Sequence, residues 1–244
     1  AMSVPIRIAL CEDTEEDAER LLRCIDESGF SAECRHFSSC EALAAEFVPG
    51  QYDLIFLDIY VDGIQQGVDV ATQIRDVDAM VTLVFTTYST EHALESYRLK
   101  AIAYLEKPVR PEDVKEILEY VEAKRKNAPS VRLLIEGKRR KIPLESILYF
   151  EQREHVVFVN TLSGVLRTSQ SVSLRDIEPL LPDSFYRSHQ SYIANLRYVK
   201  ELDQDLRIFR MQNGDVVYIR RPSISQATKI YESWLFAAAR GEES

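Results

Sequence analysis

The chain has 244 residues, of which 45% are hydrophobic and 28% charged, so it is long enough for one large or two ordinary globular domains. No apolar stretch approaches the roughly 18 residues of a membrane span and no segment resembles a signal peptide, so we expect a cytoplasmic protein with no membrane partner. The net charge of −9 is uneven, because residues 1–130 carry 13 basic and 25 acidic side chains whereas residues 131–244 carry 17 and 14, as expected for two domains with different partners.

Short apolar runs alternate with amphipathic segments over the first half of the chain. The pattern predicts five strands, at residues 4–11, 32–37, 53–57, 81–86 and 102–106. It predicts five helices between and after them, at residues 15–28, 39–47, 68–76, 91–98 and 111–124. Strands that alternate with helices in this way indicate an α/β fold with a doubly wound, five-stranded parallel sheet.

Polar residues follow four of the predicted strands. They are Glu12 and Asp13 after the first strand, Asp58 after the third, Thr86 and Thr87 at the end of the fourth, and Lys107 after the fifth. The carboxyl ends of parallel strands meet at one edge of the sheet, where open α/β sheets bind ligands. Asp58 by itself could be a simple turn residue, but clustered carboxylates repel one another unless a cation lies among them, and an all-oxygen site favours Mg²⁺. An aspartate beside Mg²⁺ can attack a phosphoryl group, whose oxygens the lysine and a threonine would bind.

Residues 4–124 resemble the receiver domain of two-component response regulators, which has a flavodoxin-like fold. The resemblance implies that Asp58 accepts a phosphoryl group from a sensor histidine kinase and that the protein is not a turnover enzyme. It also implies an Mg²⁺ site made by Glu12, Asp13, Asp58 and the backbone carbonyl of Tyr60.

The same resemblance assigns switch residues. Thr87 lies 20 residues before Lys107 and matches the switch hydroxyl, with Thr86 as the alternative. Tyr104 matches the aromatic switch residue, and plain core packing is its alternative role. The Lys107–Pro108 pair matches one whose peptide bond is usually cis.

Two features depart from the receiver pattern. In the loop after Asp58, Asp62 stands where proline is usual, and Gly67 comes nine residues on instead of eight. Tyr88 stands where a small residue usually follows the switch threonine. Its bulk would restrict the approach to Asp58.

The second half has strand-like periodicity. Residues 125–130 contain basic residues followed by Asn, Ala, Pro and Ser, and predict a linker between domains at 1–124 and 131–244. Strands are expected at residues 131–136, 139–143, 145–151, 155–160, 165–169, 206–211 and 216–219. Hairpin turns are expected at Gly137–Lys138 and Asn213–Gly214, and helices at 173–180 and 223–236. This domain is therefore mostly β.

The run from Phe185 to Asn195 contains F-x-R-x-H-x-S-x-x-x-N and resembles the signature of the LytTR-type DNA-binding domain. The resemblance implies loops that enter successive major grooves of double-stranded DNA, at direct repeats. By position it implies DNA contacts at Gln152, Arg153, His155, Arg187, Gln190, Arg220 and Arg221. Arginine suits guanine and glutamine suits adenine, while Arg187 would bind phosphate. His189, Ser191 and Asn195 are expected to hold the fold by hydrogen bonds instead.

These observations favour a response regulator that is phosphorylated on Asp58, dimerises through the face formed by residues 91–98, 102–106 and 111–124, and activates transcription. One alternative is a receiver–LytTR protein that binds DNA independently of phosphorylation. Another is an aspartyl-nucleophile phosphatase, which typically has a second aspartate where this chain has Tyr60.

Overall fold

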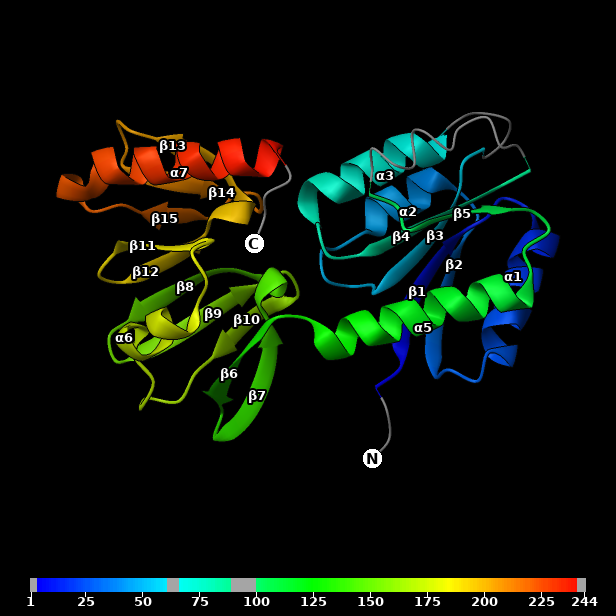
Figure 1. The fold of residues 1–244 in the computed structure, drawn as a ribbon, viewed down its shortest axis with the longest axis horizontal. Coiled ribbons are helices and arrows are strands. Elements are labelled where there is room, and N and C mark those ends of the chain that lie inside the picture. Colours follow the sequence, from blue (N-terminus) through cyan, green and yellow to red (C-terminus); the bar gives the residue numbers. More distant parts are fainter. Residues whose placement is uncertain (1–3, 61–65, 89–99, 241–244) are drawn as a thin grey trace. The chain divides into compact units, whose positions relative to one another are not determined.

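The computed structural model describes residues 4–60, 66–88 and 100–240, and its chain divides into two compact units, residues 1–128 and 129–244 (Figure 1). The helix expected at residues 91–98 and the loop residue Asp62 lie outside the described residues. No helix in the described ranges is long and apolar enough to cross a membrane.

The first unit is built on a five-stranded parallel sheet, as predicted. The strand order is β2 (Ala32–Phe37), β1 (Ile6–Cys11), β3 (Leu54–Asp58), β4 (Thr82–Thr87) and β5 (Ala103–Glu106). All residues of β3 and β4 are buried, which explains the apolar runs at residues 54–57 and 83–85.

Helices cover both faces of this sheet (Figure 1). They are α1 (Glu15–Glu27), α2 (Cys40–Glu46), α3 (Gln66–Val77) and α5 (Pro111–Asn127). Residues of α1 and α5 pack with Ile8, Leu10 and Phe56 on one face, while α2 and α3 pack with Ile55 and Leu57 on the other. The sheet is therefore a central layer with helices packed on both of its faces.

Local signals place the helix starts. The Thr14 side chain caps α1 by accepting a hydrogen bond from the backbone N–H of Asp17, and Ser39 caps α2 in the same way. Pro111 is the first residue of α5, where its missing N–H leaves no helical bond unmade.

The second unit is mostly β, as predicted, with three antiparallel sheets. A five-stranded sheet has the order β10 (Gly164–Arg167), β9 (Val156–Thr161), β8 (Ile147–Arg153), β12 (Tyr192–Asn195) and β11 (Phe185–His189). A three-stranded sheet contains β13 (Val199–Asp203), β14 (Ile208–Met211) and β15 (Val216–Tyr218). A two-stranded hairpin contains β6 (Ser130–Ile135) and β7 (Lys138–Pro143). The helices are α6 (Leu174–Ile177) and α7 (Ile224–Ala239), and short 3₁₀ turns lie between strands.

Three details differ from the sequence-based expectation. The β6–β7 turn is Glu136–Gly137 instead of Gly137–Lys138, because both turn residues have positive φ and Ile135 pairs directly with Lys138. Strands β11, β12 and β13 were not among the expected strands; the sequences of β11 and β13 mix charged and apolar residues. Helix α5 continues to Asn127, so that only Ala128 and Pro129 separate it from β6.

Candidate functional site

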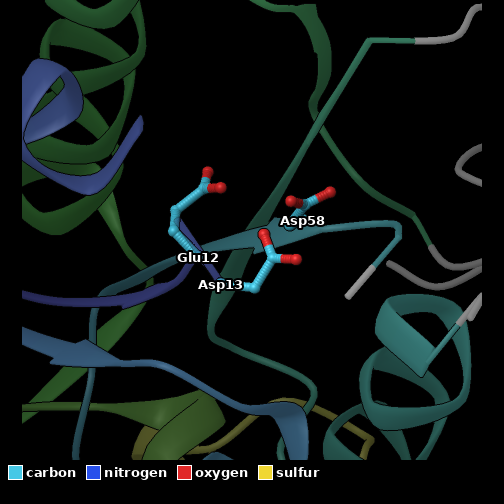
Figure 2. A group of neighbouring side chains, drawn as sticks. All are labelled: Glu12, Asp13 and Asp58. Carbon is cyan, nitrogen blue, oxygen red and sulfur yellow. The ribbon is translucent and has the colours of Figure 1, made fainter. Parts of the chain in front are cut away.

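Three carboxylates gather at the carboxyl edge of the first unit's sheet. Glu12 and Asp13 follow β1, and Asp58 ends β3, which lies beside β1 (Figure 2). One oxygen from each carboxylate lies within 4.8 Å of the others, and Glu12 and Asp58 are buried while Asp13 is half-buried. The sequence-predicted acidic residues therefore form one cluster with an opening toward solvent.

The Lys107 ammonium lies at the centre of this edge. Its Nζ donates to Glu12 Oε2 at 2.6 Å and to Asp58 Oδ2 at 2.7 Å. The lysine follows β5, and the Lys107–Pro108 peptide bond is cis, as the receiver resemblance implied. One cation thus binds the two buried carboxylates together.

Burial and charge set the ionisation of these groups. Burial raises the pKa of Glu12 to about 7, although Lys107 and Thr86 favour the charged form. Burial also raises the pKa of Asp58, against the opposing effect of Lys107. Burial alone would lower the pKa of Lys107, but its carboxylate neighbours raise it, so the ammonium stays charged.

The two threonines at the end of β4 differ in their contacts. Thr86 pairs with Asp58 across the sheet, and its Oγ1 donates to Glu12 Oε1 at 2.7 Å. Thr87 is buried, and its carbonyl accepts from the Lys107 backbone N–H at 2.7 Å. Tyr104 is half-buried in β5 and packs against the core cluster that contains Phe85. Their switch roles remain predictions.

Two further side chains belong to this edge, and the sequence did not mark them as a pair. Asp17 Oδ2 accepts from Lys107 Nζ at 3.1 Å, and Asp17 Oδ1 accepts from the Tyr88 hydroxyl at 2.8 Å. The Tyr88 ring also lies 5.3 Å from Lys107 Nζ. Nothing in the sequence around Asp17, which lies in the first turn of α1, indicates a contact with a lysine 90 residues away.

Gly67 packs against the strand that carries Asp58. A Cβ atom at Gly67 would lie 2.1 Å from the Asp58 carbonyl oxygen, and the Gly67 N–H donates to the Ile59 carbonyl at 3.2 Å. Glycine is therefore required for α3 to start this close to the end of β3.

In the second unit, the expected DNA-contact residues come from separate turns. Gln152 and Arg153 end β8, and His155 lies in the turn to β9. Gln190 lies in the turn between β11 and β12, and Arg187 donates to its carbonyl at 3.0 Å. A groove of about 490 Å³ joins these turns, and it is lined by Gln152, Glu154, Ser173, Arg175, Arg187, Gln190 and Ser191. Sequence reasoning missed Arg175 and Ser173 there.

Arg220 and Arg221 lie beyond β15 and are exposed. The Arg220 N–H donates to the Ser188 carbonyl at 2.8 Å, which ties this segment to β11. Burial and the charge of Arg220 lower the pKa of His189. The structure thus places Arg220 beside the signature strand.

Comparison with known proteins decides the family. A model of the response regulator receiver domain matches residues 8–119, and a model of the LytTR DNA-binding domain matches residues 137–231.

The chain is a response regulator with a LytTR DNA-binding domain.

This response regulator has curated relatives. The sensory transduction protein LytT of Bacillus subtilis is 24% identical over 208 residues, which cover 81% of this chain and 86% of LytT. The positive alginate biosynthesis regulatory protein of Pseudomonas aeruginosa is 27% identical over 170 residues, 62% of this chain and 66% of that protein. A solved LytTR domain from Bacillus cereus is 27% identical, covers 43% of this chain and 97% of its own, and has a TM-score of 0.37.

Membership in this family makes the protein a regulator of transcription and not a turnover enzyme. The phosphatase alternative is therefore set aside. Such phosphatases carry a second aspartate at the position where this chain has Tyr60. The Tyr60 backbone N–H donates to Asp58 Oδ1 at 3.0 Å.

An Mg²⁺ ion held by the acidic cluster would be bound less tightly below pH 7. The cation needs an ionised Glu12, whose pKa burial raises to about 7, so each binding event releases a proton at lower pH. We expect about tenfold weaker binding at pH 6 than at pH 8, measured by titration calorimetry. A Glu12→Gln variant should bind more weakly and lose most of this dependence. Equal wild-type affinity at both pH values would contradict the prediction.

Asn195 of the LytTR signature has a structural role. It is buried, its Nδ2 donates to the Ile147 carbonyl at 2.8 Å, and its Oδ1 accepts from the Arg197 N–H at 3.1 Å. Asn195→Ala leaves both groups unpaired and should lower the free energy of unfolding by about 2 kcal/mol. The exposed Gln190 offers a matched contrast: Gln190→Ala should leave stability unchanged and weaken DNA binding. Chemical denaturation measures the stability of each variant, and DNA titration measures its affinity for DNA. Similar stability of both variants would refute the structural role of Asn195.

Proposed function

We propose that Asp58 of this response regulator accepts a phosphoryl group from a sensor histidine kinase with the help of Mg²⁺. The phosphorylated protein then dimerises and binds direct-repeat DNA sites as a transcriptional activator in the cytoplasm. The proposal rests above all on one observation, the Lys107 ammonium within 2.7 Å of Asp58 and 2.6 Å of Glu12.

The acidic cluster fits Mg²⁺ in its chemistry. Its donors are oxygens, their separations allow one ion to contact all three, and the half-buried Asp13 leaves room for water ligands. Glu12, Asp13 and Asp58 would hold the ion together with the Tyr60 carbonyl. The bound cation supplies charge neutralisation for the incoming phosphoryl oxygens.

The protein's own groups prepare Asp58 for attack. Hydrogen bonds from the Tyr60 N–H to Oδ1 and from Lys107 to Oδ2 hold the carboxylate in one orientation. A carboxylate oxygen attacks phosphorus, the phosphorus–nitrogen bond to the donor histidine breaks, and the electron pair leaves with the imidazole. Lys107 then binds a phosphoryl oxygen, while a hydroxyl from Thr87 or Thr86 binds another.

The signal to the second unit is proposed to pass through the end of β4 and β5. Thr87 is expected to move toward the phosphoryl group and Tyr104 to follow, which shifts the population toward a dimer-forming surface. Two LytTR domains would then occupy two repeated half-sites. In each domain the side chains that face bases would be those of Gln152, Arg153, His155, Gln190, Arg220 and Arg221. Arg187 would bind phosphate.

The test is light scattering during size-exclusion chromatography, with and without Mg²⁺ and beryllofluoride, which mimics a phosphoryl group on Asp58. A change from monomer to dimer, accompanied by tighter binding to promoter DNA, is the expected result. A protein that binds the mimic but neither dimerises nor gains DNA affinity would contradict the proposed switch.

Tyr88 favours one alternative, DNA binding that is independent of phosphorylation. Its hydroxyl bonds to Asp17 and its ring lies over Lys107, so it stands at the approach to Asp58. Equal DNA affinity with and without beryllofluoride would support this alternative. Tyr88→Ala, in which the approach is open, should then respond to the mimic.

A further inference from the structure

The β6–β7 hairpin accounts for the net positive charge of the second unit. Of residues 130–143, five are basic and one, Glu136 in the turn, is acidic. The other residues of the unit contain 12 basic and 13 acidic side chains, for a net charge of −1. A domain that binds a polyanion needs concentrated positive charge, and here the hairpin provides it.

One face of the hairpin collects three of these basic residues. Strand β6 buries Val131, Leu133 and Ile135, so the alternate residue Arg132 lies on the opposite face. Arg132 pairs directly with Lys141, and Leu134 pairs with Arg139. Arg132, Arg139 and Lys141 therefore share one face, which we call the basic ribbon, and all three are exposed.

The arrangement places two basic side chains opposite each other across the hairpin. Like charges directly opposite each other on neighbouring strands destabilise the pair, and Arg132 and Lys141 are such a pair. Within the described part of the chain, Arg132 and Arg139 form no ion pair. A polyanion bound to this face would remove the repulsion.

Two of the basic side chains at or near the groove already have acidic partners. Arg153 Nη2 lies 2.8 Å from Glu151 Oε2, and Arg187 Nη1 lies 2.8 Å from Glu178 Oε2. Each must give up a carboxylate partner to bind phosphate. These two arginines therefore add less net attraction for the DNA backbone than arginines that have no acidic partner.

We propose that the basic ribbon binds the phosphate backbone of the DNA duplex outside the base-contacting turns. The inference rests on the proposed DNA binding and extends it to a surface that lies away from β13–β15 and α7 within the second unit (Figure 1). The ribbon gives affinity without sequence preference, and the turns give specificity. Duplex DNA is favoured over the acidic first unit because Arg139 and Lys141 lie within residues 137–231, which match the LytTR DNA-binding domain.

The test uses the full chain and a 30-base-pair duplex of mixed sequence, titrated by fluorescence anisotropy between 50 and 200 mM salt. We compare the wild type with Arg132→Gln/Arg139→Gln and with a control of equal charge, Lys229→Gln/Arg240→Gln in and after α7. Each lost phosphate contact lowers the slope of log affinity against log salt by about 0.9. The ribbon variant should lose roughly 1.8 in slope and about tenfold in affinity at 100 mM salt, whereas the control should change little.

Stability provides an independent readout. Arg132 and Arg139 are exposed and form no ion pair within the described residues, so the ribbon variant should unfold at about the same temperature as the wild type. A variant that binds DNA with the wild-type slope would overturn the ribbon while leaving the proposed function intact. Tighter DNA binding by the variant would also overturn it and would indicate that the ribbon contacts the acidic first unit. A wild type that binds no duplex at 50 mM salt would overturn DNA binding itself.

Discussion

Asp58→Asn is expected to abolish phosphorylation by acetyl phosphate while leaving the protein folded. The amide has the size of the carboxylate but cannot attack phosphorus, so the loss should exceed a thousandfold. Lys107 keeps two carboxylate partners in this variant, Glu12 at 2.6 Å and Asp17 at 3.1 Å, and is not left buried without one. Intact-protein mass spectrometry and thermal unfolding measure the two effects.

Asp13→Asn is the matched control for this experiment. It retains the nucleophile and changes a neighbour in the same cluster, so phosphorylation should be slower but detectable, and high Mg²⁺ should restore part of the rate. Phosphorylated Asp58→Asn protein would show that another side chain accepts the phosphoryl group. Equal loss in both variants would show that the acidic cluster acts only as a unit.

Lys107→Met is expected to lower the free energy of unfolding at pH 8 without Mg²⁺ by about 3 kcal/mol. The lysine side chain is 3% exposed, and its removal leaves the buried carboxylates of Glu12 and Asp58 without their cation. Burial already raises the pKa of both acids, and the loss of Lys107 raises both pKa values further. Their ionisation therefore opposes folding, and the penalty grows as pH rises through about 7.

Lower pH, added Mg²⁺ and a surface variant provide the controls for Lys107→Met. At pH 5.5 Glu12 is largely protonated, so the destabilisation should be smaller there, and Mg²⁺ at pH 8 should reduce it as well. Lys115→Met, on the exposed face of α5, should change stability by less than about 0.5 kcal/mol. A Lys107→Met penalty that is independent of pH would show that packing, and not charge, is the main contribution.

The fold was predictable from sequence because its signals are local. The buried run of β3 and the polar residues after β1, β3 and β5 are enough to place Glu12, Asp58 and Lys107 at one edge of the sheet. The LytTR signature likewise marked Arg187 and Gln190, which the structure brings to one groove with Gln152.

What the sequence did not reveal depends on contacts between distant segments. Asp17 and Tyr88 lie 71 residues apart, and only the packing of α1 beside the end of β4 makes them partners. The turn at Glu136–Gly137 was placed one residue too late because the glycine was assigned to its first position, whereas the strand register puts it second. Strand β13 has no clear alternation, and its pairing with β14 comes from tertiary structure.

The contact between Gly67 and Asp58 gives a fixed point for comparing receivers with loops of different length. A side chain at Gly67, the second residue of α3, would collide with the carbonyl of Asp58, so the helix can begin this close to β3 only with a glycine at that position. The additional residue of this chain must therefore be accommodated between Asp58 and Gly67. Related chains should be aligned on this glycine and not by counting from the aspartate, since counting would rotate every later residue of α3 by about 100° around the helix axis.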